Sequence, residues 1–123
     1  MIEATKPDSI VAVVDDLFFA SKIRAAAETS GVKVRFAKTI DLVMAAVESD
    51  KPSLIIADLQ SARCNAIELA RRLKADDRWR DIPLIGFFSH VHAELERQAR
   101  AAGFDRTLTN SMLAGALPEL LRS

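Results

Sequence analysis

Apolar and polar positions alternate along the chain in blocks that predict five strands, each followed by a helix. Three of the apolar runs are continuous, which is typical of strands buried on both faces of a parallel sheet. They cover about residues 10–14, 54–57 and 84–87. The run at residues 32–36 alternates apolar and basic residues as an edge strand does, and residues 106–109 give a weak fifth strand.

Helical patterns fill the intervals between these strands. The expected helices span about residues 17–29, 40–49, 65–75, 93–102 and part of 112–122. Asp16, Thr39 and Asn65 are residue types that cap helix N-termini. Pro118 limits the last helix, either as a first-turn residue or as a kink. Strands that alternate with helices predict right-handed crossovers and an α/β fold with a doubly wound parallel sheet.

The composition predicts one soluble, cytoplasmic domain. A chain of 123 residues, half of them apolar, suits a single domain with a sizeable core, here about residues 10–121. Residues 1–9 are expected to be a flexible N-terminus and not a signal peptide. The 17 basic and 17 acidic residues balance without a basic stripe, which disfavours nucleic-acid binding. The single cysteine, Cys64, fits a reducing compartment, and no apolar run approaches the roughly 18–20 residues of a membrane span.

Three carboxylates follow the ends of two of the buried strands. Asp15 and Asp16 follow the first apolar run, and Asp58 follows the third strand. Ligands of open parallel sheets bind outside the carboxyl ends of the strands. If the two strands are neighbours, the carboxylates converge and repel one another, so the cluster indicates a bound cation or a chemical task. The alternative is that Asp16 only caps its helix and Asp58 is only a polar strand end.

This arrangement resembles the response-regulator receiver family, which has the flavodoxin-like CheY fold. The resemblance covers about residues 10–121 and is carried by Val13–Asp16, Ile55–Asp58, Asp81–Ile85 and Ala102–Asp105. It implies a sheet of order 2-1-3-4-5 with the site between strands 1 and 3. It also implies that Asp58 accepts a phosphoryl group from a histidine kinase. The implied Mg²⁺ ligands are Asp15, Asp16, Asp58 and the carbonyl of Gln60, and Mg²⁺ prefers such oxygen ligands.

Several positions depart from the receiver pattern. The lysine that follows strand 5 in receivers is replaced by Asn110, whose amide donates a hydrogen bond but brings no charge. The threonine or serine that ends strand 4 is replaced by Phe88, which cannot bond a phosphoryl oxygen, and Ser89 is next. The loop after strand 3 has Ala62 and Asn65–Ala66 where proline and an Asp-Gly pair are frequent. These departures predict a degenerate, or pseudo-receiver, site.

Other residues near the site have open roles. Lys22 or Arg63 is an alternative source of positive charge, although neither has the spacing of the family's lysine. His90 and His92 form a weak pattern for a metal site and are expected to face solvent. The role of Cys64 is open as well.

Three functions are compatible with this chain. The first is a signalling module that is slowly phosphorylated on Asp58, and the second is a pseudo-receiver that acts by protein contact alone. The third, an enzyme with Asp58 as nucleophile, is disfavoured because Gln60 stands where aspartate phosphohydrolases usually have a general acid. The expected partners are a sensor kinase or a downstream effector, and a second copy bound through helix 4, strand 5 and helix 5. The run Glu94–Arg100 is either a solvated surface or part of that interface.

Overall fold

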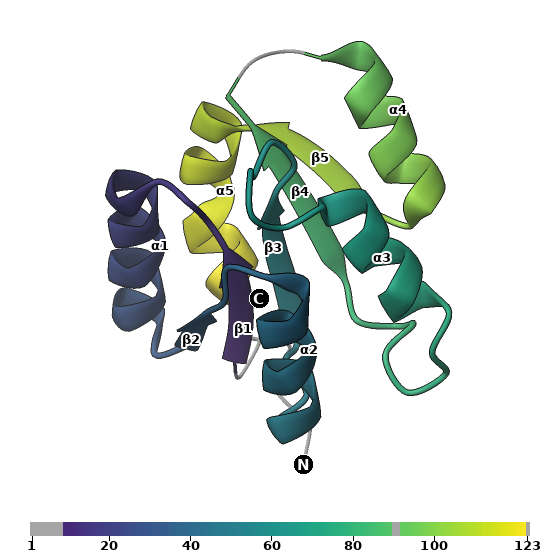
Figure 1. Cartoon of the computed structure of the whole chain (residues 1–123). Coiled ribbons are helices and arrows are strands. Elements are labelled where there is room, and N and C mark those ends of the chain that lie inside the picture. Colours follow the sequence, from purple (N-terminus) through teal and green to yellow (C-terminus); the bar gives the residue numbers. More distant parts are fainter. Residues whose placement is uncertain (1–8, 90–91, 123) are drawn as a thin grey trace.

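The fold is a five-stranded parallel sheet with helices on both faces (Figure 1). The computed structural model describes residues 9–89 and 92–122. The strands are β1 (Ser9–Val13), β2 (Lys33–Phe36), β3 (Leu54–Asp58), β4 (Leu84–Phe88) and β5 (Arg106–Thr109). The helices are α1 (Leu17–Ser30), α2 (Ile40–Ser49), α3 (Ala66–Lys74), α4 (Ala93–Ala102) and α5 (Asn110–Arg122). The order β2-β1-β3-β4-β5 confirms the predicted fold class and topology.

Some predicted boundaries are wrong by one or two residues. β1 begins at Ser9, which is buried, so this residue belongs to the sheet and not to the predicted N-terminal tail. Residues 1–8 lie outside the described residues. The last helix begins at Asn110, because the Thr109 hydroxyl oxygen accepts a hydrogen bond from the backbone N–H of Met112 (3.1 Å) as an N-cap does. Pro118 lies inside α5 and not in its first turn.

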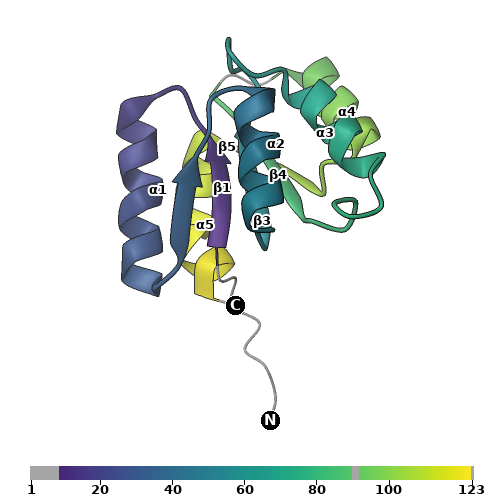
Figure 2. The ribbon, with the colours of Figure 1, turned by 60° about the horizontal axis from the view of Figure 1, so that its bottom comes forward.

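The sheet separates two apolar clusters. On β1, Val11 and Val13 pack toward α2, α3 and α4, whereas Ile10 and Ala12 pack toward α1 and α5 (Figure 2). Successive strand residues point to opposite faces, so a strand covered on both faces must be apolar throughout. This is why the continuous apolar runs identify the central strands, and why their carboxyl ends are the places where polar residues become accessible.

The helices are short and their starts are fixed by side-chain caps. Asp16, Thr39 and Asn65 each accept a hydrogen bond from a backbone N–H in the first turn of α1, α2 and α3, which confirms the predicted caps.

Within the described part of the chain, no helix combines the length and apolar character that crossing a membrane requires.

Arg35 connects the edge strand β2 to α2 by hydrogen bonds. Arg35 of β2 donates hydrogen bonds to the backbone carbonyls of Ala46 (2.6 Å) and Asp50 at the end of α2. A cation is favourable at a helix C-terminus because the last carbonyls carry partial negative charge. The contact therefore fixes α2 against a short strand that pairs, within the described part of the chain, with β1 alone.

Candidate functional site

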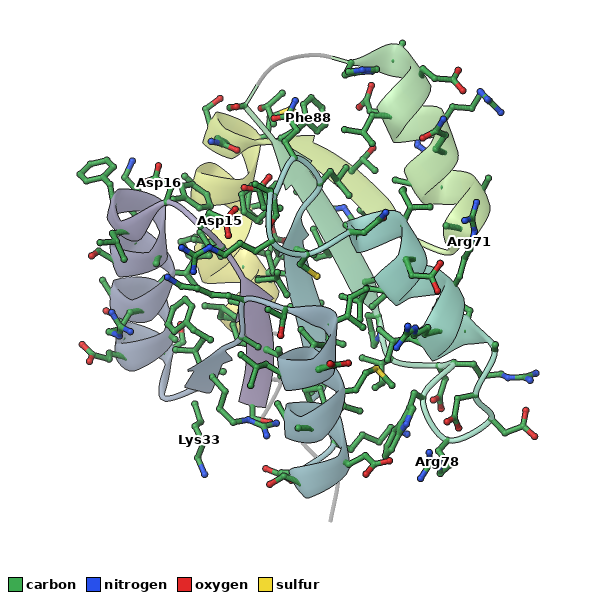
Figure 3. All side chains as sticks on the ribbon, viewed as in Figure 1. Asp15, Asp16, Lys33, Arg71, Arg78 and Phe88 are labelled. Carbon is green, nitrogen blue, oxygen red and sulfur yellow. The ribbon has the colours of Figure 1, made fainter. Side chains whose placement is uncertain are left out.

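The three predicted acids come together at the carboxyl edge of the sheet. Asp58 is the last residue of β3, and β3 lies beside β1 with Ala57 opposite Val13. Asp15 follows the end of β1 and Asp16 begins the turn into α1, as Figure 3 shows. The predicted neighbourhood of β1 and β3 is confirmed by the register, so the acids of the two strands meet at one edge.

Asp58 is a half-buried carboxylate, and the charged groups that act on it among the described residues are the carboxylates of Asp15 and Asp16. Burial raises the pKa of Asp58 above its usual value, and the charges of Asp15 and Asp16 raise it further. One of its oxygens, Oδ1, accepts a hydrogen bond from the backbone N–H of Gln60 (2.8 Å), which partly opposes the rise. The ionised form of Asp58 is therefore disfavoured in the folded protein, so a cation bound at this edge would stabilise that form.

Replacing Asp58 by asparagine is expected to raise the thermal midpoint by a few degrees at neutral pH. The raised pKa means that ionised Asp58 opposes folding, and asparagine removes the charge while its carbonyl still accepts the Gln60 N–H. The difference in thermal midpoint between Asp58→Asn and the wild type should shrink as the pH falls through the folded-state pKa of Asp58. It should vanish below the ordinary aspartate pKa of about 3.9. Thermal melts of both proteins across this pH range measure this difference. It should be small, because solvent around the half-exposed Asp58 carboxylate screens its charge.

The matched control is Asp16→Asn. It removes the same charge from an exposed residue and keeps a helix-capping side chain. A smaller rise than that of Asp58→Asn is expected. An equal rise in the two variants, or a difference that persists in acid, would contradict the burial of Asp58 as the cause.

Asp15 is held by the loop between β3 and α3. Its Oδ2 accepts hydrogen bonds from the hydroxyl of Ser61 (3.0 Å) and the backbone N–H of Ala62 (3.0 Å). The Ser61 hydroxyl oxygen in turn accepts from the backbone N–H groups of Arg63 and Cys64. The other carboxylate oxygen, Asp15 Oδ1, is buried and has no hydrogen-bond partner among the described residues. A buried unpaired carboxylate oxygen is costly, so it is the atom of this site best suited to a cation or a water.

A second bridge joins the loops that follow β3 and β4. The side-chain carbonyl of Gln60 accepts hydrogen bonds from the backbone N–H (2.9 Å) and the hydroxyl (3.1 Å) of Ser89. Ser89 is therefore engaged with the loop after Asp58. The bridge makes the positions of the two loops interdependent.

The two positions where the receiver pattern is lost have different surroundings. Phe88, the last residue of β4, is 3% exposed and packs in the cluster between the sheet and α2, α3 and α4. Asn110, the first residue of α5, is half-buried, and its Oδ1 has no hydrogen-bond partner among the described residues. An apolar ring that packs in the core thus stands at the end of β4, and a neutral amide stands at the start of α5.

Known proteins share this architecture. No protein-family model matches the chain. The phosphate regulon transcriptional regulatory protein PhoB of Pseudomonas aeruginosa is 31% identical over 101 residues, which are 82% of this chain and 44% of that protein. The chain therefore spans less than half the length of this relative.

Solved structures of response regulators superimpose on most of the chain. The phosphorylated cyanobacterial phytochrome response regulator RcpA has a TM-score of 0.81 at 17% identity, covering 92% of this chain and 90% of its own. The Mn²⁺-bound response regulator Rcp1 also scores 0.81, at 16% identity, covering 94% and 96%. The chemotaxis response regulator CheY4 of Vibrio cholerae scores 0.76 at 15% identity, covering 92% and 98%.

The chain belongs to the CheY-like receiver family. The sequence relative and the shared strand order support the same assignment. In this receiver, the acid pair after β1 and the lone acid that ends β3 occupy the edge at which the sheet order reverses. Such a switch point is where open α/β sheets bind their ligands.

The other residues singled out from the sequence have different surroundings. Lys22 lies over the ring of Phe18 on α1, with its ammonium 5.0 Å from the ring centre, and Arg63 lines a groove between α3 and α4. His92 is exposed and caps α4 through its Nδ1, whereas His90 lies outside the described residues. Cys64 is buried, and burial raises the pKa of its thiol.

Magnesium binding at this receiver stays a prediction. Among residues 9–89 and 92–122, no group of three or more His, Cys, Asp and Glu side chains is arranged to hold a metal ion. Mg²⁺ usually keeps several waters and needs only one or two carboxylates from the protein. Two features fit such an ion: the Oδ1 of Asp15, which has no partner among the described residues, and the raised pKa of Asp58, whose ionised form a cation would stabilise.

Sequence reasoning missed Ser61. Its hydroxyl connects Asp15 to the loop that follows Asp58, across 46 residues of sequence. The local signal was present, because a serine that accepts N–H bonds from the next residues is a common turn motif. The long-range bond to Asp15 has no sequence signal.

Proposed function

We propose that this chain is a signalling receiver of the two-component type that acts through a protein partner, with an atypical phosphoacceptor site at Asp58. The observation that carries the proposal is the meeting of Asp15, Asp16 and Asp58 at the switch point of the sheet. The relatives support it, since they are a transcriptional regulatory protein and response regulators, one of them phosphorylated. No enzymatic activity is proposed, because Gln60 has an amide where a general acid would be needed.

The atypical character rests on the groups around Asp58. A phosphoryl group carries charge on its oxygens, and its transfer is aided by fixed cations. Asn110 supplies no cation. Receivers usually have a hydroxyl at the end of β4 that contacts the phosphoryl group, whereas the Phe88 ring at this position packs in the core. We therefore expect slow phosphorylation of Asp58 and a weak structural response to it.

A fully phosphorylation-independent interaction module is the second candidate. Phe88 favours it, because a ring packed in the core leaves the end of β4 few alternative positions. The hydroxyl of Thr107 on β5 donates to Glu96 of α4, and Arg100 donates to the same hydroxyl, both at 3.4 Å. These contacts support a fixed surface of α4, β5 and α5 that binds a sensor kinase, an effector or a second copy of the chain.

Millimolar Mg²⁺ is expected to raise the thermal midpoint of the wild-type protein by a few degrees. The ion would bind the folded state at Asp15, Asp16 and Asp58, with the Gln60 carbonyl, and a ligand that binds only the folded state stabilises it. The rise follows from replacing carboxylate repulsion by attraction to the cation. Differential scanning fluorimetry with and without Mg²⁺ measures it.

Asp16→Asn is expected to abolish the Mg²⁺ effect while keeping the α1 cap, because asparagine also caps helices. Sodium chloride at matched ionic strength controls for general screening. An unchanged midpoint of the wild type in Mg²⁺ would rule out a functional metal site here.

Beryllofluoride, which stands in for the phosphoryl group on Asp58, tests how the signal spreads. With Mg²⁺ it is expected to shift the backbone NMR signals of the loops near Asp58 and to change those of the α4, β5 and α5 surface little. The reason is that Phe88 offers no hydroxyl to follow the bound group. Two-dimensional ¹⁵N spectra provide the readout.

The control for this experiment is Asp58→Asn, which cannot carry the beryllofluoride group and should show no shifts. Large shifts across Glu94–Arg106 in the wild type would contradict the fixed surface and favour a phosphorylation switch. Shifts confined to the loops near Asp58 would favour phosphorylation without a distal response.

A further inference from the structure

A groove of about 750 Å³ lies between α3, α4 and the loop that precedes α3. Its floor is apolar, with the buried Leu59, Cys64 and Ala66 and the partly exposed Ile67 and Leu95. α3 and α4 lie side by side in Figures 1 and 2. None of Asp15, Asp16 and Asp58 lines the groove.

The exposed rim of this groove is positively charged. Arg63 from the loop and Arg71 from α3 line it, and Arg71 lies between α3 and α4 in Figure 3. Within the described ranges, neither arginine side chain is engaged in an ion pair, a hydrogen bond or a ring contact. By contrast, Arg72 and Arg97 do not line the groove and are paired with Glu68 and Glu94.

No acidic side chain is among the described residues that line the groove. Glu68 of α3 is paired with Arg72, and Glu94 of α4 is paired with Arg97 and bonded to the amide of Gln98. Two unpaired guanidinium groups beside an apolar floor form a surface that complements a ligand with carboxylate groups and an apolar side chain of its own.

We propose that the α3–α4 groove binds an extended, acidic peptide segment of a protein partner. Its carboxylates pair with Arg63 and Arg71, and an apolar side chain packs on Ile67 and Leu95. The five residue-to-residue steps from Ala66 to Arg71 span about 7.5 Å of helix axis, close to the ~6.6 Å that separates alternate residues of an extended peptide. A small anion fits less well, because small-ligand sites bury most of their ligand, whereas Arg63, Arg71 and Gln98 are exposed.

The groove is also connected to the acid site. Ser61 lines the groove and donates its hydroxyl hydrogen bond to Asp15. A segment bound against this loop therefore contacts the same residues that hold the Asp15 carboxylate. Binding at the groove and ligation at the acids are expected to influence each other, although the groove itself requires neither phosphorylation nor a metal.

Fluorescence polarisation with labelled peptides tests the proposal in the absence of Mg²⁺ and phosphodonor. The probes are short peptides with two glutamates spaced by one to three residues and one leucine, and a matched lysine–leucine set is the control. At least one glutamate–leucine peptide should bind saturably. Arg63→Gln and Arg71→Gln should each raise its Kd roughly fivefold or more, as loss of a well-placed charge pair does.

Arg72→Gln is the matched control, because it removes the same charge from the neighbouring position but outside the groove. Its Kd should stay within about twofold of wild type. Equal losses for Arg71→Gln and Arg72→Gln would assign the binding to general charge attraction and overturn the proposal. Failure of every glutamate–leucine peptide to bind, equal binding of the lysine peptides, or complete displacement by inorganic phosphate would overturn it too.

A ¹⁵N titration with the best peptide locates the site. The proposal predicts shifts at residues 61–67, 71 and 95–98 and none on α1 and α5. Shifts centred on α5 would overturn it. Because these experiments contain no phosphodonor, their outcome is independent of whether Asp58 can be phosphorylated.

Discussion

Replacing Asn110 by lysine is expected to raise the rate at which acetyl phosphate labels Asp58 by on the order of 10²-fold, the scale on which a fixed transition-state stabiliser acts. Asn110 begins α5 directly after β5 and brings no charge to the carboxyl edge of the sheet. An ammonium group on a flexible stem would stabilise the charge on the phosphoryl oxygens. Phos-tag electrophoresis or mass spectrometry of the acyl phosphate, with Mg²⁺ present, measures the rate.

Ser111→Lys is the control for this experiment, because it adds the same charge at the next, exposed position. It should leave the labelling rate close to that of the wild type. If Asn110→Lys and the wild type are labelled equally, the missing charge is not the limiting defect, and Phe88 becomes the next residue to test.

Replacing Phe88 by alanine is expected to lower the free energy of unfolding by about 3–5 kcal/mol, as truncation of a buried phenylalanine does. The ring is 3% exposed and packs between the sheet and the helices on one face. Native domains have only about 5–15 kcal/mol of stability, so the loss would be a large part of the total. Urea denaturation followed by circular dichroism measures it.

Phe18→Ala is the matched control, because the Phe18 ring is 71% exposed on α1. Its effect should stay within about 0.5 kcal/mol. A loss below about 1 kcal/mol for Phe88→Ala would contradict the packing role of this ring. Phe88→Thr would restore a hydroxyl at the end of β4 but would also leave a cavity, so it should destabilise the protein almost as much as alanine does.

Much of the fold could be predicted because its signals are local. The apolar runs of β1, β3 and β4 reflect burial on both faces, and the caps Asp16 and Asn65 act within their own first turns. The start of α5 was missed although Thr109 has a residue type suited to capping, because a strand that passes directly into a helix leaves no loop to mark the boundary.

The acid cluster was predictable for the same reason, since strand ends and topology bring Asp15, Asp16 and Asp58 to one edge. The hydrogen bonds that hold Asp15 and the loop after Asp58 in place could not be predicted. The bonds from Ser61 to Asp15 and from Ser89 to Gln60 join residues 46 and 29 positions apart. They depend on loop paths and side-chain rotamers, which no local pattern encodes.

The two outer strands have a consequence for how copies of the chain can associate. β2 and β5 are four residues long, and among residues 9–89 and 92–122 each pairs with one neighbour only. β2 has Lys33 and Arg35, and β5 begins with Arg106. Short, basic edge strands disfavour pairing between sheets of different molecules, since like charges would meet. Concentrated solutions of the folded chain should therefore resist the growth of β-rich aggregates.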